Sequence, residues 1–187
     1  MEYVQPIRDL DTLEEFKTTL KERNERDYVM FMLGITTGLR ISDILALRVK
    51  DVRGDYIRNR EIKTDKKRRT PISLELRKAL NPYIQSMDEE DFLIKSRQRD
   101  EKGRQKAIHR SQAYRIIKEA AKAIGYKEDV GTHTGRKTFG YWHYKKYGNA
   151  AALRKIFNHD DDQTTLAYIG VDQDYLDETI MGLYRRR

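Results

Sequence analysis

The stretch from Tyr28 to Ile35 constrains the fold more than any other part of the sequence, because almost every residue in it is apolar. A helix over about residues 25–36 would be apolar on nearly all sides, and such a helix is normally buried. Gly38 supplies a typical C-terminal end for it. A buried helix needs other elements packed around it, so the pattern predicts a mainly helical domain built on this segment.

The segment before this helix predicts an amphipathic helix, capped by Asp11, with Leu13, Phe16 and Leu20 on one face. After Gly38, Ser42 is expected to cap a short helix that carries Ile44, Leu45 and Leu47. Further helices are expected over residues 74–86, 110–124, 133–147, 149–157, 161–169 and 172–184. Gly125 and Gly148 are expected to end two of them.

The segment from Val49 to Ser73 is rich in residues that favour strands, and Gly54-Asp55 supplies turn chemistry within it. It predicts a small three-stranded antiparallel sheet, with Pro71 on an edge strand. Residues 88–109 are expected to form a long polar connection. The expected fold class is therefore α+β, mainly α with this small sheet, in a single domain over residues 1–187.

The charge balance indicates a polyanionic partner, because 38 Lys and Arg face 30 Asp and Glu, which gives a net charge of +8. The absence of cysteine excludes disulfides and thiolate metal sites. Residues 1–11 contain no apolar core of a secretory signal, and no window approaches 18 apolar residues. We expect a soluble cytoplasmic protein without a membrane span.

Four short motifs carry candidate chemistry, and the first is centred on Arg40 at a helix junction. Arg40 stands just before an expected helix N-terminus, where main-chain N–H groups favour an anion. The second is the segment Lys63–Arg69, in which five of seven residues are basic. This segment fits a finger that reaches a phosphate or a groove and a solvated loop tip about equally well.

The third motif is His133 with Arg136, which share one face of a helix and can address one phosphate. The fourth is His159 with Tyr168 nine residues later. Taken alone, Tyr168 is an ordinary core residue of an amphipathic helix, since the chain contains 12 tyrosines.

The order and combination of these motifs resemble the catalytic domain of the tyrosine recombinase (phage integrase) family, from about Arg8 to Arg187. The resemblance implies six catalytic residues: Arg40, Lys63, His133, Arg136, His159 and the nucleophile Tyr168. It also implies that Asp43 helps to hold the first arginine. The chain departs from the family pattern at Asn158, where glycine is usual, and at Gly135, where leucine is frequent. The core-binding domain that normally precedes the catalytic domain is expected to be absent.

These residue types suit attack on a phosphodiester. Two guanidiniums neutralise the charge that develops on the phosphate oxygens. A free tyrosine has a pKa near 10, so roughly one in a thousand is ionised at pH 7. His133 is the expected base, Lys63 the proton donor to the leaving 5′-oxygen, and His159 a hydrogen-bond donor to the phosphate. A covalent 3′-phosphotyrosine would store the bond energy for resealing, with no metal or cofactor required.

Affinity for double-stranded DNA is expected from basic residues outside the catalytic set. Lys95–Lys118 contains nine basic and two acidic residues. The candidate DNA-binding residues are Lys66, Lys67, Arg68, Arg69, Arg104, Lys106, Arg110 and Arg115. If about six phosphates are neutralised, affinity falls roughly 10³-fold between 50 and 200 mM salt.

The C-terminal stretch is apolar at helical spacing, through Tyr175, Leu176, Ile180, Met181 and Leu183. Docking of this helix on a second protomer, which would assemble a tetramer on DNA, and docking on its own domain are about equally expected. Two other functions remain open. One is relaxation of supercoils in the manner of a type IB topoisomerase, and the other is a non-catalytic DNA-binding regulator derived from a recombinase.

Overall fold

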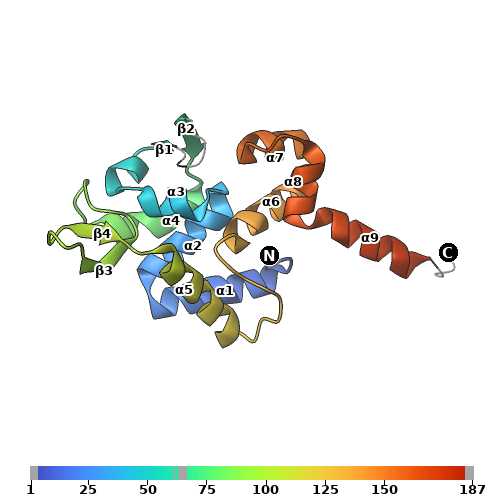
Figure 1. Cartoon of the computed structure of the whole chain (residues 1–187), viewed down its shortest axis with the longest axis horizontal. Helices are drawn as coiled ribbons and strands as arrows, with labels where there is room; N and C mark the ends of the chain where they lie inside the picture. Colours follow the sequence, from blue (N-terminus) through green and yellow to red (C-terminus); the bar gives the residue numbers. More distant parts are fainter. Residues whose placement is uncertain (1–3, 61, 63–66, 184–187) are drawn as a thin grey trace.

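The computed structural model describes residues 4–60, 62 and 67–183, with the side chains of residues 59, 60 and 68 excepted. Its elements up to the second strand are α1 (Leu10–Arg23), α2 (Glu25–Thr37), α3 (Ile41–Ala46), the 3-10 turn η1 (Val49–Val52), β1 (Tyr56–Arg60) and β2 (Lys67–Pro71). The remaining elements are α4 (Leu74–Ile84), β3 (Lys95–Arg99), β4 (Gln105–Ala107), α5 (Arg110–Ala123), α6 (Thr134–Tyr147), α7 (Ala150–Phe157), α8 (Asp162–Ile169) and α9 (Val171–Gly182) (Figure 1).

Helix α2 is the centre of the main core, as its sequence predicts. Its residues from Val29 to Gly34 are all buried, and α1, α3, α4 and α6 contact it. Gly38 ends the helix with a φ of 62°, in the left-handed region that glycine adopts without steric cost. The predicted central helix and its end are confirmed.

The crossing of α2 and α6 depends on two glycines that face each other. A Cβ atom added to Gly135 would lie 3.3 Å from the Cα of Gly34. Larger residues at either position would push the two helices apart. Gly135, where the family often has leucine, is therefore explained by close packing of the helix that carries His133 and Arg136.

The ends of two early helices differ from the expectation. The N-cap of α1 is Asp9, whose carboxylate accepts a hydrogen bond from Thr12 N at 2.7 Å, while Asp11 lies inside the first turn. The N-cap of α3 is Arg40, without a side-chain cap, so Ser42 lies within that helix. The predicted buried face of α1, Leu13, Phe16 and Leu20, is confirmed.

The predicted three-stranded sheet is wrong in strand number, because the described residues form two separate two-stranded antiparallel sheets. In the first, β1 pairs with β2 from Tyr56↔Pro71 to Arg60↔Lys67. The segment Val49–Val52 forms a 3-10 turn, since its main-chain N–H groups bond to Asp91 and Glu89. The second sheet, β3–β4, occupies part of the expected polar connection. The α+β, mainly helical class is confirmed.

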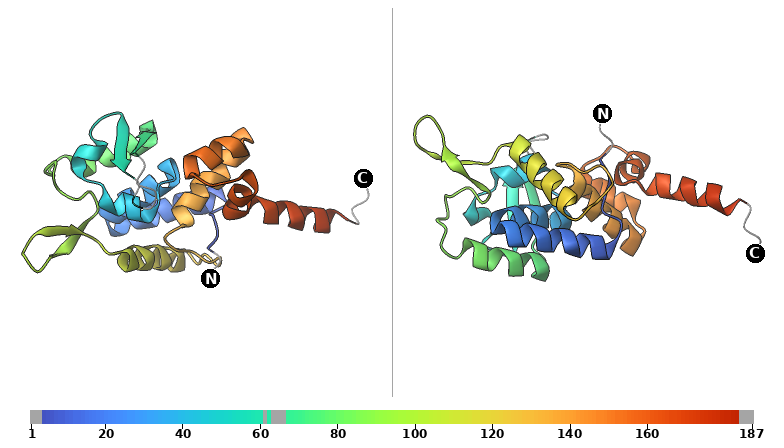
Figure 2. Two further views of the ribbon diagram at one scale, coloured as in Figure 1. Left: turned by 45° about the horizontal axis from the view of Figure 1, so that its top comes forward. Right: turned by 90° about the horizontal axis from the view of Figure 1, so that it is seen from below.

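Helices α7 and α8 form a second, smaller apolar cluster with α6. Its buried members are Leu153, Phe157 and Ile169. Helix α9 then extends away from the body of the molecule (Figures 1 and 2), and none of its residues is buried. Among the described helices, none is both long and apolar enough to cross a membrane.

Candidate active site

Tyr168 and His133 meet at the point where α8 packs on the N-terminal end of α6. The Nδ1 atom of His133 lies 3.0 Å from the hydroxyl oxygen of Tyr168, and the two rings are nearly perpendicular. His133 is the N-cap residue of α6 and Tyr168 stands in the last turn of α8. The distance allows a proton to pass directly from the phenol to the imidazole.

The two predicted arginines converge on one main-chain oxygen. Nη2 of Arg40 donates to the carbonyl oxygen of Phe157 at 3.2 Å, and Nη2 of Arg136 donates to the same oxygen at 2.9 Å. Arg136 also donates to the carbonyl of Gly38. Arg136 is only 3% exposed and its guanidinium lies 4.2 Å from the ring centroid of Phe157. The two positive charges are thus held side by side, where both guanidiniums can bind one phosphate.

His159 is oriented by a threonine from the next helix. Its Nδ1 atom lies 3.1 Å from the Oγ1 of Thr165, and that hydroxyl donates to the carbonyl of Asp161 at 3.0 Å. Because the hydroxyl proton goes to Asp161, the Nδ1 of His159 donates to Thr165 and carries the ring proton in the neutral form. The His159 and Tyr168 rings are 5.2 Å apart, so His159 borders the same site.

The turn from α7 into His159 uses a left-handed residue. Asn158 ends α7 with φ and ψ of 52°, and His159 N donates to the carbonyl of Arg154 at 3.0 Å. Asparagine tolerates this conformation better than other residues with a side chain. The departure from the family's usual glycine therefore leaves the path of the chain intact.

The electrostatics of the site act differently on the predicted base, His133, and on the predicted nucleophile, Tyr168. Burial, together with the charges of Arg110, Arg136, Lys137 and Arg40, lowers the pKa of His133 to about 4, so the imidazole is neutral at pH 7. Burial raises the pKa of Tyr168, and Arg136 and Arg40 partly oppose this. Burial also lowers the pKa of His159. At pH 7 the site therefore places the neutral His133 imidazole, which can accept a proton, next to the protonated Tyr168 phenol.

Lys63 lies outside the described residues, so its predicted place in the site stays a prediction. Asp43 is buried in α3, and its Oδ1 accepts a hydrogen bond from the main-chain N of Ile62 at 2.9 Å. This bond ties α3, which follows Arg40, to the residue next to Lys63. The predicted support of Arg40 by Asp43 stays a prediction.

Several predicted DNA-binding residues lie on exposed surfaces. Arg69 covers the ring of Tyr56 at 3.7 Å, and Arg104 is paired with Asp100 at 2.8 Å. The charge of Arg110 acts on His133, which locates Arg110 near the catalytic cluster. Lys67 and Arg115 are exposed and Lys106 is partly so, while Lys66 and the side chain of Arg68 lie outside the described part of the chain.

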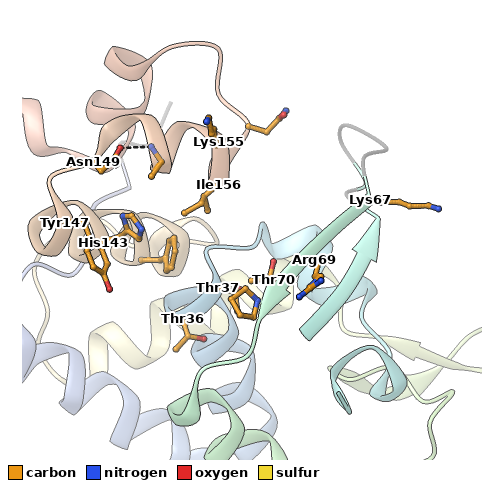
Figure 3. A pocket seen from close by; sticks show the side chains of 14 residues that line it. Thr36, Thr37, Lys67, Arg69, Thr70, His143, Tyr147, Asn149, Lys155 and Ile156 are labelled. Atoms are coloured by element: carbon orange, nitrogen blue, oxygen red, sulfur yellow. Dashed lines mark hydrogen bonds between the residues drawn. The ribbon is translucent and has the colours of Figure 1, made fainter. Parts of the chain in front are cut away.

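A pocket of about 880 Å³ opens beside the candidate active site, between β2 and helices α6 and α7 (Figure 3). Arg69 lines one wall and Lys155 lies on the opposite side, while Lys67 borders the pocket with its side chain pointing away from it. Asn158, next to His159, also lines it. The pocket thus has basic side chains on two sides next to the candidate active site.

Three contacts of the site were missed from the sequence. Thr165 orients His159, Lys137 lies against the ring of Tyr168, and the Phe157 carbonyl binds both arginines. Only Lys137 left a signal, because it is a basic residue directly after Arg136 and one helical turn after His133. Within the described ranges, no group of three or more His, Asp or Glu side chains is arranged to hold a metal ion.

Comparison with known proteins decides the family. The family model described as "Phage integrase family" matches residues 8–174. The chain belongs to this family. It is 46% identical over 175 residues to the probable integrase/recombinase YoeC of Bacillus subtilis, and the match covers 93% of each chain. It is also 31% identical over 160 residues to a tyrosine recombinase of Pseudothermotoga lettingae, covering 83% of this chain and 53% of that protein.

Solved structures agree with this assignment at the level of the fold. The crystal structure of XerA recombinase superposes with a TM-score of 0.72 at 23% identity, over 98% of this chain and 65% of that one. XerH recombinase bound to its difH substrate gives a TM-score of 0.69 at 18% identity, over 96% of this chain and 55% of that one. The chain thus spans nearly all of YoeC but only about half to two thirds of these longer recombinases. The predicted family and recombinase class are confirmed.

Proposed function

We propose that this chain is a site-specific DNA recombinase that cuts and rejoins strands through a covalent bond between Tyr168 and a DNA 3′-phosphate. The observation that carries the proposal is the 3.0 Å contact between the Tyr168 hydroxyl and the His133 Nδ1. The two guanidiniums that share the Phe157 carbonyl stand beside it. Family membership supports the same chemistry.

In the proposed cleavage step, the Tyr168 oxygen attacks the phosphorus while its proton passes to the Nδ1 of His133. The bond between phosphorus and the 5′-oxygen breaks, and that oxygen takes a proton from Lys63. Arg40 and Arg136 release the Phe157 carbonyl and bind the non-bridging oxygens, where negative charge develops. A 5′-hydroxyl from another strand then attacks the phosphotyrosine and gives its proton to Lys63. The bond between phosphorus and the Tyr168 oxygen breaks, His133 returns the proton to that oxygen, and the DNA is resealed.

Double-stranded DNA is the proposed substrate, bound through the exposed basic residues around the site. Lys67 and Arg69 on β2, together with Arg110 and Arg115 on α5, would contact the phosphate backbone. Such contacts position a protein without selecting a sequence. The prediction of roughly 10³-fold weaker binding between 50 and 200 mM salt applies to this surface.

Self-association on DNA through α9 is the second part of the proposal. No residue of α9 is buried, and its apolar side chains are exposed: Tyr175, Leu176, Ile180 and Met181, with Leu183 directly after it. A solved λ integrase with the same fold is a tetramer on a Holliday junction. We propose a tetramer in which each α9 docks on the next protomer, and a cytoplasmic location with the DNA substrate.

The decisive experiment is trapping with nicked suicide DNA, in which the cleaved fragment diffuses away and religation is blocked. Wild type should form an adduct that survives a denaturing gel, and Tyr168→Phe should form none. Tyr147→Phe, which removes the hydroxyl of an exposed tyrosine on α6, is the matched control and should react like wild type. DNA binding without any adduct would leave a non-catalytic regulator as the better description. Relaxation of supercoiled DNA without exchange between two sites would favour a topoisomerase.

A further inference from the structure

Lys137 occupies an unusual position for a lysine. It is the fourth residue of α6, one after Arg136, and it is only 8% exposed. Its Nζ atom lies 5.0 Å from the centroid of the Tyr168 ring. Residues four apart on a helix share a face, so Lys137 stands on the same side of α6 as His133. One face of the helix therefore presents a base to the Tyr168 hydroxyl and an ammonium to its ring.

An ammonium group against an aromatic ring is attracted by the negative charge of the π-system. The attraction grows when the phenol loses its proton, because the ring of a phenolate carries part of the negative charge. The contact is therefore stronger in the reacting form of Tyr168 than in its resting form. An interaction that is stronger in the transition state than in the ground state lowers the barrier, whereas one that is equally strong in both does not.

Burial of this charge is costly, which argues against an incidental contact. Lysine is almost never fully buried unless it is paired. Burial, and to a smaller extent the charge of Arg8, lowers the pKa of Lys137. Other charges around Tyr168 come from Arg40 on the α2–α3 junction and from Arg136 on α6. The ring of Tyr168, on α8, is thus an aromatic face against Lys137 within this positive environment.

We propose that Lys137 is a positioning residue for the nucleophile, whose ammonium fixes the Tyr168 ring and favours its phenolate during attack. The inference rests on the proposed function of Tyr168. The arginines act on the phosphate, and Lys137 would be a further cation that acts on the ring of the nucleophile. The contact is expected to contribute about tenfold to the cleavage rate, which is the range of a partly desolvated cation–π contact.

The test compares Lys137→Met, Lys137→Arg and a matched control. Methionine keeps the length and apolar stem without the charge, and arginine keeps the charge. Lys145→Met is the control, because Lys145 is exposed on the same helix with its Nζ 5.5 Å from the Tyr141 ring. Each protein is saturated with nicked suicide DNA, and the first-order rate of adduct formation is measured from pH 6 to 9.5. Thermal unfolding of each variant is recorded in parallel.

We expect Lys137→Met to slow adduct formation about tenfold at pH 7 and to move the rise of the rate to higher pH. Lys137→Arg should keep the wild-type profile, and Lys145→Met should match wild type throughout. A wild-type rate and profile in Lys137→Met would overturn the inference. Equal losses in Lys137→Met and Lys137→Arg, with lowered unfolding temperatures and an unchanged pH profile, would show a packing role and overturn it too.

Failure of the underlying function gives a different result. If Tyr168→Phe still forms the adduct, the nucleophile assignment is wrong whatever the Lys137 variants do. If Tyr168→Phe forms none and Lys137→Met reacts like wild type, only the role of Lys137 is wrong. Lys137→Gln serves as the second charge-free variant if methionine prevents folding.

Discussion

Helices α8 and α9 follow each other with only Gly170 between them, yet they meet the rest of the molecule in opposite ways. In α8, Thr165 and Ile169 are buried, and Ile169 joins the apolar cluster with Phe157. In α9 no residue is buried, although Leu176 and Ile180 are as apolar as anything in α8. Figure 2 shows α8 against the body of the molecule and α9 leading away from it.

The difference follows from what each helix packs against. Helix α8 is held by its buried residues Thr165 and Ile169 and by the 3.0 Å contact between the Tyr168 hydroxyl and His133. Helix α9 packs on its own domain only in its first turn, through the partly buried Val171 and the Arg8–Asp174 ion pair, so folding contributes little to the position of the rest. A long exposed apolar face on one helix indicates an interaction with another molecule. If the proposed assembly is right, α8 is the part stabilised by folding and α9 is the part available to a second protomer.

The largest effect on folding should come from Phe157→Ala. The Phe157 ring is fully buried and lies 5.6 Å from the Tyr168 ring. Its removal should lower the free energy of unfolding by about 3–5 kcal/mol. It should also reduce adduct formation, because α8 loses its support. Urea unfolding and the suicide-DNA assay measure the two effects.

Leu176→Ala on α9 is the control and should change the free energy of unfolding by less than about 0.5 kcal/mol. Equal losses in both variants would contradict the distinction between the helices.

A smaller effect should appear on acidification. The folded protein holds His133 with a pKa of about 4, below the ordinary value of 6.5, so the unfolded chain binds the proton more readily between these values. The contribution of His133 to stability is therefore complete above pH 6.5 and is lost as the pH falls towards 4. NMR titration of the His133 ring should give a midpoint near 4, and a midpoint near 6.5 would refute this prediction. Between pH 6.5 and 4, the free energy of unfolding of His133→Gln should therefore fall less than that of wild type, because the variant lacks the group that titrates.

The junction between the two helices should contribute less again. Arg8 donates from Nε to Asp174 Oδ1 at 2.9 Å and from Nη2 to the Gly170 carbonyl at 3.5 Å. The Arg8 and Asp174 side chains are 29% and 30% exposed, so a double-mutant cycle should give a coupling of about 0.5–1 kcal/mol. The more exposed pair Arg23–Glu119 is the control and should give a smaller coupling. A coupling near zero for Arg8–Asp174 would mean that this bond does not fix the base of α9.

Sequence patterns predict the helices and strands whose apolar residues are buried together. The run in α2 is apolar on all sides of the helix, and few arrangements other than a central helix bury such a segment. Gly38 marks its end. The strands β3 and β4 were missed because Lys95–Arg99 is polar and mostly exposed, so no alternation of apolar residues marks it. The cap at Asp9 was missed because Asp11 offers the same chemistry two residues later.

The candidate site shows the same limit. Arg40, His133, Arg136, His159 and Tyr168 were found because their types and order are specific, and the structure brings all five together. The partnership of His159 with Thr165 depends on how α7 turns into α8, which residue types alone do not specify. The burial of Lys137 likewise follows from the packing of α8 on α6, which the residue type alone does not specify.

The smallest effect on folding, and the sharpest test of the comparison, concerns the apolar face of α9. Leu176→Ser with Ile180→Ser should change the free energy of unfolding by less than about 0.5 kcal/mol, because both side chains are 50–70% exposed already. The same change should weaken assembly on DNA at least tenfold, since burial of each side chain against a second protomer would contribute about 1.5–3 kcal/mol. Light scattering of the protein with a duplex substrate measures the assembly. Gln173→Ser with Asp177→Ser, on the same helix, is the control and should assemble like wild type. A stability loss above about 1 kcal/mol with unchanged assembly would mean that α9 packs on its own domain in solution.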